Sequence, residues 1–282
     1  LKTARSEAQN AFGNGDLILE KAVVRPRHVE IQVFADSHGP VIHFGERDCS
    51  VQRRHQKVIE EAPCPVMTPE LRERMGAAAV EAARTVGYVG AGTVEFLLDE
   101  SGAFYFLEMN TRLQVEHPVT EMVSGLDLVA LQLRVARGEK LGIAQQDVTL
   151  NGHAIEVRLY AEDPEAGFLP SSGHLHLFHA PSGEGVRVDA GVETGGDVSP
   201  FYDSMLAKIV AHGATRDEAR RRLISALSST AVFGPRINRD FLIDALGQTS
   251  FADGKATTAF IGETYGERFQ PAKTSDVMLA AA

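Results

Sequence analysis

The spacing of apolar and polar positions predicts many short strands with a smaller number of helices between them. Segments rich in β-branched and aromatic residues predict strands at residues 17–20, 28–34, 41–44, 93–98, 104–109, 153–160, 174–178, 186–188 and 205–212. Apolar positions at helical spacing predict helices at residues 5–12, 69–86, 127–137, 216–228 and 238–246. Thr68 and Pro69 supply a helix cap and a first-turn proline for the second of these helices. The mixture indicates an α+β fold, with a second α+β unit beginning near residue 152.

One predicted hairpin brings two acidic residues together. Ser101 and Gly102 suit a two-residue loop between the strands at 93–98 and 104–109. If Glu100 pairs with Ala103, counting outward places Glu95 opposite Glu108, with Cβ atoms about 4.5–5.5 Å apart. Two carboxylates this close repel each other unless a cation or a proton lies between them. Hard oxygen ligands favour Mg²⁺ or Mn²⁺, so we expect a divalent metal at this pair.

The polar residues after the second strand keep a period of two, and we expect them to share one face if the segment stays extended. They are Glu108, Asn110, Arg112, Gln114 and Glu116. Phe104 and Phe106 have the same parity, which predicts a hydrophobic core that continues into a functional site. The alternative is an edge strand with one face in water, which also alternates.

Composition and charge narrow the class of protein. The chain has 282 residues, 44% of them hydrophobic, and a formal net charge of −10, which favours one large or two modest domains and argues against a general nucleic-acid binder. No apolar run reaches the length of a membrane span, so we expect a cytoplasmic protein, or a mitochondrial matrix protein in a eukaryote. Cys49 and Cys64 are expected to be reduced thiols. The basic cluster at residues 52–57 favours a small anion, the alternative being a solvated segment paired with Glu60 and Glu61.

Three segments resemble motifs of biotin carboxylases, the ATP-grasp enzymes that carboxylate biotin with ATP and bicarbonate. Residues 108–121 (EMNTRLQVEHPVTE) resemble the family signature, residues 46–57 (ERDCSVQRRHQK) a second motif and residues 26–32 (PRHVEIQ) a third. The resemblance implies an ATP-grasp central domain with an antiparallel sheet, followed by the biotin carboxylase C-terminal α+β domain. The implied boundaries are 1–24 for the end of the lid and the hinge, 25–150 for the core, 151–266 for the C-terminal domain and 267–282 for a linker tail.

The resemblance also implies a role for each site residue. The metal that bridges the ATP phosphates is expected on Glu95, Glu108 and Asn110, and bicarbonate on Lys57, Arg112, Gln114 and Val115. Glu116 resembles the general base and Arg158 the arginine that binds biotin, so the expected catalytic residues are Arg112, Glu116 and Arg158. For Arg158 an ion pair with Glu156 or Glu162 is the alternative. The remaining ATP contacts are expected from Glu20, Lys21, Ala22, Val23, His28, Gln52, His55 and Leu97, together with the two metal carboxylates.

The implied parent enzyme is the α subunit of an acyl-CoA carboxylase of the methylcrotonyl-, propionyl- or acetyl-CoA type. Its expected partners are a biotin carboxyl carrier domain and a carboxyltransferase subunit. We expect it to bind neither nucleic acid nor a membrane. The family's N-terminal domain and most of its glycine-rich lid have no counterpart here, so we expect a fragment that is inactive alone. Two alternatives stay open. One is another ATP-grasp ligase such as a carbamoyl-phosphate synthase, against which residues 112–117 and Arg158 argue; the other is a non-catalytic nucleotide-binding fragment.

Overall fold

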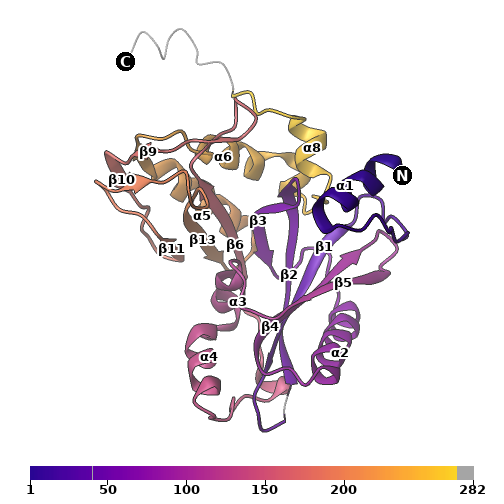
Figure 1. The fold of residues 1–282 in the computed structure, drawn as a ribbon. Helices are drawn as coiled ribbons and strands as arrows, with labels where there is room; N and C mark the ends of the chain where they lie inside the picture. Colours follow the sequence, from indigo (N-terminus) through magenta and orange to yellow (C-terminus); the bar gives the residue numbers. More distant parts are fainter. Residues whose placement is uncertain (40, 272–282) are drawn as a thin grey trace, which may run out of the picture.

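A long antiparallel sheet runs through the molecule (Figure 1), as seen in a computed structural model that describes residues 1–39 and 41–271. Its strand order is β11-β13-β6-β3-β2-β1-β4-β5. The strands are β1 (Arg27–Ala35), β2 (Val41–Arg53), β3 (Gln56–Ala62), β4 (Gly90–Leu98), β5 (Phe104–Asn110), β6 (His153–Tyr160), β11 (Val186–Ala190) and β13 (Met205–Gly213). Because β3 pairs with β6, the sheet is continuous across residue 150.

Helices and short strands surround this sheet. The helices are α1 (Lys2–Phe12), α2 (Pro69–Thr85), α3 (His117–Ser124), α4 (Leu128–Ala136), α5 (Arg216–Ser229), α6 (Arg239–Gly247), α7 (Thr249–Ala252) and α8 (Phe260–Tyr265), with a 3₁₀ turn at Gln145–Asp147. The short strands are β7 (Glu162–Asp163), β8 (Leu169–Pro170), β9 (Gly173–His174), β10 (Leu177–His179), β12 (Asp197–Val198) and β14 (Ala231–Phe233). Among the described residues, no helix combines the length and the apolar character that crossing a bilayer requires.

Strand β1 is buried on both faces, but the two faces differ in chemistry. Val29, Ile31 and Val33 pack into the hydrophobic cluster that includes Leu71 and Met75 of α2. The alternate positions carry the buried polar side chains of residues 28, 30 and 32. A strand in the middle of the sheet therefore presents a polar surface on the side away from α2.

The second half of the chain has its own hydrophobic core. Alternate residues of β6 and β13, including Ile155 and Ile209, pack against α5 through Leu223 and against α6 through Phe241. These elements are the brown-to-yellow part of Figure 1. The opposite face of β6 is thereby left to face α3 and the centre of the molecule.

Most predicted elements are present, and the helix cap predicted at Thr68 forms. The side chain of Thr68 accepts a hydrogen bond from the Leu71 N–H at the start of α2, and Asp127 caps α4 in the same way. The strand predicted at residues 17–20 is wrong: these residues are irregular, and Leu19 is 95% exposed. No strand pairing includes this segment, although the free edge of β5 carries Tyr105, which the following Lys21 contacts. Residues 272–282 of the expected linker tail lie outside the described residues.

Candidate active site

The hairpin between β4 and β5 pairs Glu95 with Glu108, as the sequence predicted, although the turn and the register near it differ from the prediction. The predicted two-residue loop is wrong, because the Asp99 N–H donates to the carbonyl of Ala103 and the turn is one residue longer. A β-bulge at Leu107 then inserts one extra residue into β5 and restores the expected register. The longer turn and the bulge each shift the register by one residue in opposite directions, so Glu95 still pairs with Glu108.

The same bulge overturns the expected face for the aromatic residues of β5. The rings of Phe104 and Phe106 lie 5.4 and 6.4 Å from the ring of Phe96, on the side away from Glu95. The prediction that these rings share the carboxylate face is therefore wrong. The extra residue changes the parity of the strand, so Leu107 takes the position facing the site, beside Leu97.

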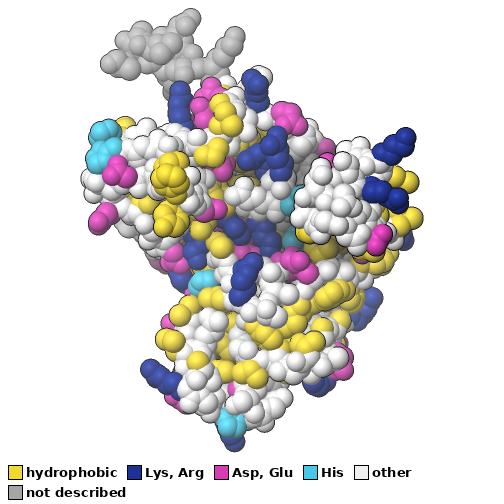
Figure 2. Space-filling model, viewed as in Figure 1, with side chains coloured by type: hydrophobic (Ala, Val, Ile, Leu, Met, Phe, Trp, Pro, Cys, Tyr) yellow, Lys and Arg dark blue, Asp and Glu magenta, His cyan; other side chains and the backbone are white. Residues whose placement is uncertain are grey.

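A cavity of about 640 Å³ opens on the polar face of the sheet, within the usual range for ligand sites. Figure 2 shows a hollow in the middle of the molecule with Lys, Arg, Asp and Glu side chains gathered in it. The cavity is lined by fourteen of the predicted site residues: Val23, His28, Gln52, His55, Lys57, Glu95, Leu97, Glu108, Asn110, Arg112, Gln114, Val115, Glu116 and Arg158. Pro26, Gln56, Leu107 and Thr258 also line it.

Three of the predicted ATP contacts lie outside this cavity. Glu20, Lys21 and Ala22 are exposed, and the last two line a separate shallow pocket beside Tyr105. The ammonium of Lys21 lies 5.5 Å from the centroid of the Tyr105 ring. The structure thus brings only Val23 of this segment to the main cavity.

The three expected metal ligands are in contact with one another. The amide of Asn110 lies 3.1 Å from Oε1 of Glu95 and 3.0 Å from Oε1 of Glu108. Burial works against the charge on Glu95, but His28 and Lys57 outweigh it and lower the pKa of Glu95. An ionised carboxylate, a second carboxylate and an amide oxygen form a donor set that fits Mg²⁺ or Mn²⁺. The residues present therefore fit the metal that the family implies.

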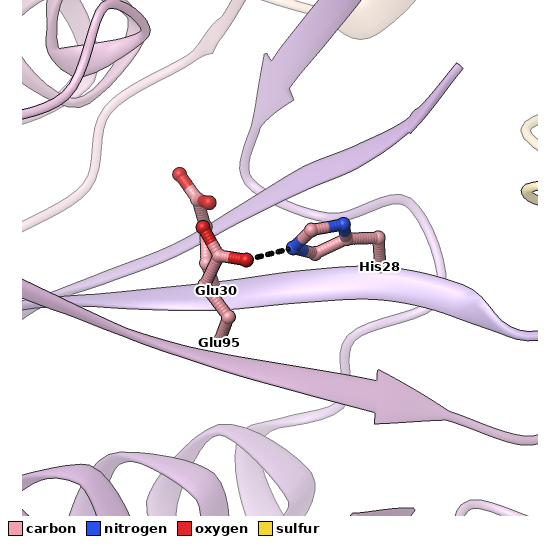
Figure 3. A group of neighbouring side chains, drawn as sticks. All are labelled: His28, Glu30 and Glu95. Carbon is pink, nitrogen blue, oxygen red and sulfur yellow. Dashed lines mark ion pairs between the residues drawn. The ribbon is translucent and has the colours of Figure 1, made fainter. Parts of the chain in front are cut away.

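Lys57 fills the acidic pocket next to this donor set. His28, Glu30 and Glu95 offer ligand atoms within 4.8 Å of one another, and His28 lies 2.8 Å from Glu95 in an ion pair (Figure 3). The ammonium of Lys57 already lies 2.6 Å from Glu30, 2.9 Å from Glu95 and 2.6 Å from Glu116. These carboxylates outweigh burial and raise the pKa of Lys57. The alternative pairing of the basic cluster with Glu60 and Glu61 is wrong for this residue, and the pocket holds a cation without a metal.

Glu30 contacts Lys57 and is itself paired with the buried Arg47. Neither Glu30 nor Arg47 was predicted as a site residue from the sequence. Arg47 is completely buried and donates to Glu30 at 2.5 Å and to Gln32 at 2.6 Å. Burial opposes the charge on Glu30, but Arg47 and Lys57 lower its pKa to about 2. Alternate polar residues in residues 26–32 could have revealed this layer, had the strand been recognised as central rather than exposed on one side.

The segment after β5 does not stay extended, as the period-two pattern assumed. β5 ends at Asn110, and Glu116 precedes the first turn of α3. The side chains still converge: the Gln114 amide donates to Glu95 at 2.8 Å, and Arg112 lies 3.4 Å from Asn110. Within the described part of the chain, Arg112 makes no ion pair, so its guanidinium is available to an anion in the cavity.

Arg158 reaches the cavity from the second half of the chain. Its Nε donates to Glu60 at 2.6 Å and its Nη2 to Glu116 at 3.1 Å, so the alternative pairing with Glu156 or Glu162 is wrong. The pairing of β3 with β6 causes this arrangement, because it sets Arg158 beside Lys57 and Glu116. The oxygens of Glu116 are therefore divided between Lys57 and Arg158.

A tight turn holds His55 at the rim of the cavity. Arg53 pairs with Gln56, and the two residues between them, Arg54 and His55, have φ values of 49° and 69°. Two-residue hairpin turns of this kind usually carry Asn or Gly, because side chains disfavour positive φ. The β2–β3 turn therefore keeps a strained histidine next to Gln52 and Lys57.

Comparison with known families agrees with this geometry. The model of the ATP-binding domain of the carbamoyl-phosphate synthase L chain matches residues 1–144, and the model of the biotin carboxylase C-terminal domain matches residues 156–263. The first match defines the class, an ATP-grasp nucleotide-binding protein, and confirms the predicted α+β fold. With the second match, the chain belongs to the biotin carboxylase family.

Individual relatives are consistent with this family. The chain is 50% identical over 260 residues to a biotin carboxylase of Nostoc sp., covering 92% of this chain and 58% of that protein. It is 52% identical over 262 residues to the mitochondrial methylcrotonoyl-CoA carboxylase subunit alpha of Rattus norvegicus, covering 93% and 37%. The chain thus spans about half the length of the curated relatives it matches.

Solved structures give the same result for the fold. The biotin carboxylase domain of a thermophilic 2-oxoglutarate carboxylase bound to bicarbonate superposes with a TM-score of 0.90 at 47% identity, covering 93% of this chain and 59% of that one. A Hydrogenobacter thermophilus 2-oxoglutarate carboxylase domain in complex with MgADP, ADP and bicarbonate gives a TM-score of 0.89 at 47% identity, covering 93% and 58%.

Proposed function

We propose that the cavity carries out the ATP- and bicarbonate-dependent carboxylation of biotin held on a carrier domain. The observation that carries this proposal is the meeting of Arg112, Glu116 and Arg158 beside the Glu95, Glu108 and Asn110 donor set. One end of the cavity thus has the groups that a metal-bound nucleotide requires, and the other has two guanidinium groups for anionic or developing negative oxygens. Two solved relatives, one bound to bicarbonate and one in complex with MgADP, ADP and bicarbonate, support the same assignment.

Each residue of the cavity is assigned one role in the reaction. Arg112 binds bicarbonate with its guanidinium fork, and Lys57, Gln114 and Val115 complete the anion pocket. Glu116 takes the bicarbonate proton as the oxygen attacks the γ-phosphorus and ADP leaves. The resulting carboxyphosphate breaks into CO₂ and phosphate, and the phosphate takes the ureido N–H proton as the nitrogen bonds to CO₂. Arg158 stabilises the negative charge that develops on the ureido oxygen. The metal, when bound, neutralises charge on the ATP phosphates.

The nucleotide contacts follow from the lining of the same cavity. We assign the adenine to the apolar side formed by Val23 and Leu97, with Leu107 added, and the phosphates to the side of His28, Gln52 and His55. Glu20, Lys21 and Ala22 keep their proposed nucleotide role only if their exposed segment closes over the cavity. We also retain the proposed division at 25–150 and 151–266, with residues 1–24 as lid end and hinge.

The proposed partners and location rest on the relatives. We propose that the parent enzyme pairs with a biotin carboxyl carrier domain and a carboxyltransferase subunit, as the α-subunit name of the rat relative suggests. We assign it to the cytoplasm, or to the mitochondrial matrix in a eukaryote, since the rat relative is named mitochondrial.

Isotope transfer tests this function. The full-length enzyme is incubated with ATP, Mg²⁺, ¹⁴C-bicarbonate and free biotin, and acid-labile label on biotin is measured. We expect label on biotin that requires ATP and is lost in Arg158→Gln. ATP cleavage that depends on an amine and not on biotin would instead favour a carbamoyl-phosphate synthase type of ligase. Nucleotide binding without either activity would favour a non-catalytic module.

A further inference from the structure

Two carboxylates meet behind Arg158, in a place that the proposed chemistry does not use. Glu60 on β3 and Glu156 on β6 are directly opposed in the antiparallel register, and both are completely buried. Directly opposed residues have Cβ atoms about 4.5–5.5 Å apart. The sheet therefore holds two acidic side chains against each other, away from water.

Hydrogen bonds leave most oxygens of this pair unsatisfied. Arg158 donates to Oε1 of Glu60 at 2.6 Å. Among the described residues, Oε2 of Glu60 and both carboxylate oxygens of Glu156 have no hydrogen-bond partner. A buried ionised oxygen without a partner is costly, whereas a protonated carboxyl group has a donor of its own to offer its neighbour.

Apart from Arg158, the charged groups around the pair are engaged with other residues. Those that face it from β3, β6, β13 and the start of α3 are Lys57, Arg158, Lys208 and Glu116. Lys57 is shared by Glu30, Glu95 and Glu116, and Lys208 donates to the carbonyl of Val115 and lies 3.4 Å from Asp189. On its other side the pair adjoins an apolar cluster of Ala62, Val119, Val123, Ala154 and Val210.

The balance of charges around the pair also favours a protonated carboxyl group. The connected network under the cavity contains five carboxylates, Glu30, Glu60, Glu95, Glu116 and Glu156. Its permanent cations are Arg47, Lys57 and Arg158, and His28 pairs with Glu95 at the far end from Glu156. Burial raises the pKa of Glu60 to about 7, although Arg158 opposes the rise. Burial and the adjacent Glu60 raise the pKa of Glu156 well above its usual range.

We propose that Glu60 and Glu156 share one proton, with Glu156 as the protonated member, and that the single charge left on Glu60 positions Arg158 for biotin. With both carboxylates ionised, a second negative charge would compete with Glu116 for the guanidinium. With neither ionised, Nε of Arg158 would lose its anionic partner. The positioning of Arg158 for biotin rests on the proposed function; the shared proton does not.

Infrared spectroscopy of the full-length enzyme detects the shared proton without any turnover. A protonated carboxyl group has a carbonyl band separate from carboxylate and amide bands, and the band shifts in D₂O. We expect this band in the wild-type enzyme at neutral pH, its loss in Glu156→Gln and its retention in the control Glu73→Gln, which changes an exposed residue of α2. Absence of the band from the wild-type enzyme, or its persistence in Glu156→Gln, would overturn the proposal.

Kinetics of the same variants test the positioning role. Glu156→Gln replaces a neutral acid with a neutral amide, so we expect biotin carboxylation within about twofold of wild type at pH 7, and less decline than wild type as the pH rises. Glu60→Gln removes the charge that holds Arg158, and we expect biotin carboxylation to fall about tenfold or more, with a smaller effect on bicarbonate-dependent ATP cleavage. If Glu156→Gln does not fold, Glu156→Leu, also neutral, takes its place. Failure of both to fold, or equal losses in the Glu60 and Glu156 variants, would contradict the proposal.

Discussion

The ammonium of Lys57 lies 2.6 Å from Oε1 of Glu116 and connects the two ends of the cavity. The same ammonium contacts Glu95 of the metal donor set at 2.9 Å, and the second oxygen of Glu116 is 3.1 Å from Arg158. A series of ion pairs therefore runs from the proposed nucleotide side to the proposed biotin side. The proposed base lies at its centre, where a change at either end alters its surroundings.

Replacing Lys57 by Met should destabilise the fold. The substitution leaves Glu30, Glu95 and Glu116 facing one another without their shared cation, and removing one partner of a buried ion pair costs about 3–5 kcal/mol. Urea denaturation of the full-length enzyme measures this loss. Lys255→Met, which breaks an exposed pair with Asp253, should cost less than about 1 kcal/mol. Equal losses in the two variants would argue against the buried network.

Replacing Glu116 by Gln should slow catalysis without affecting nucleotide binding. Removing a general base typically lowers the rate about 10²–10⁴-fold, and we expect this drop in kcat for bicarbonate-dependent ATP cleavage. ATP affinity, measured by equilibrium binding, should stay close to wild type. If affinity and rate fall together, Glu116 has a structural role instead.

Replacing Glu108 by Gln should weaken binding of ATP when the metal is limiting. The substitution removes one of the two carboxylates that meet at the β4–β5 hairpin, and excess Mg²⁺ should restore much of the affinity. Glu100→Gln, on the turn of the same hairpin, serves as the matched control and should leave affinity unchanged. Identical metal titrations for the two variants would exclude Glu108 as a ligand.

The ion pairs of Glu30 should make the fold sensitive to acid. Because the folded-state pKa of Glu30 is about 2, below its ordinary value of 4.5, its contribution is fully present above about pH 4.5 and is lost as the pH falls toward 2. One such proton gives a slope of up to about 1.4 kcal/mol per pH unit. Denaturation at several pH values should show a shallower acid slope in Glu30→Gln than in wild type. Parallel slopes would refute the assignment.

Local rules predicted the helix starts and the paired carboxylates well. Thr68 and Asp127 cap α2 and α4 because their hydroxyl and carboxylate oxygens reach free N–H groups close in sequence. The pairing of Glu95 with Glu108 was predicted correctly although the loop was not, since the bulge at Leu107 compensates for a longer turn. Turn length and bulges depend on packing that a single sequence does not reveal.

Contacts between distant segments were less accessible to sequence reasoning. Arg158 reaches Glu60 because β3 pairs with β6, two strands almost a hundred residues apart. No local pattern in the sequence predicts that pairing, so an ion pair of Arg158 with a near neighbour remained an open alternative. Burial of Arg47 was missed for a similar reason, because its partners Glu30 and Thr120 come from different segments.

The most direct test of the account compares two activities of the full-length Arg158→Gln variant. Carboxylation of biotin and bicarbonate-dependent ATP cleavage without biotin are measured on the same preparation, with Arg84→Gln, an exposed change on α2, as the control. Because Arg158 is proposed to act on the ureido oxygen, biotin carboxylation should fall by about 10²-fold or more, while ATP cleavage stays much closer to wild type. Equal losses in both activities, or no loss in either, would contradict the claim that Arg158 forms the biotin end of this cavity.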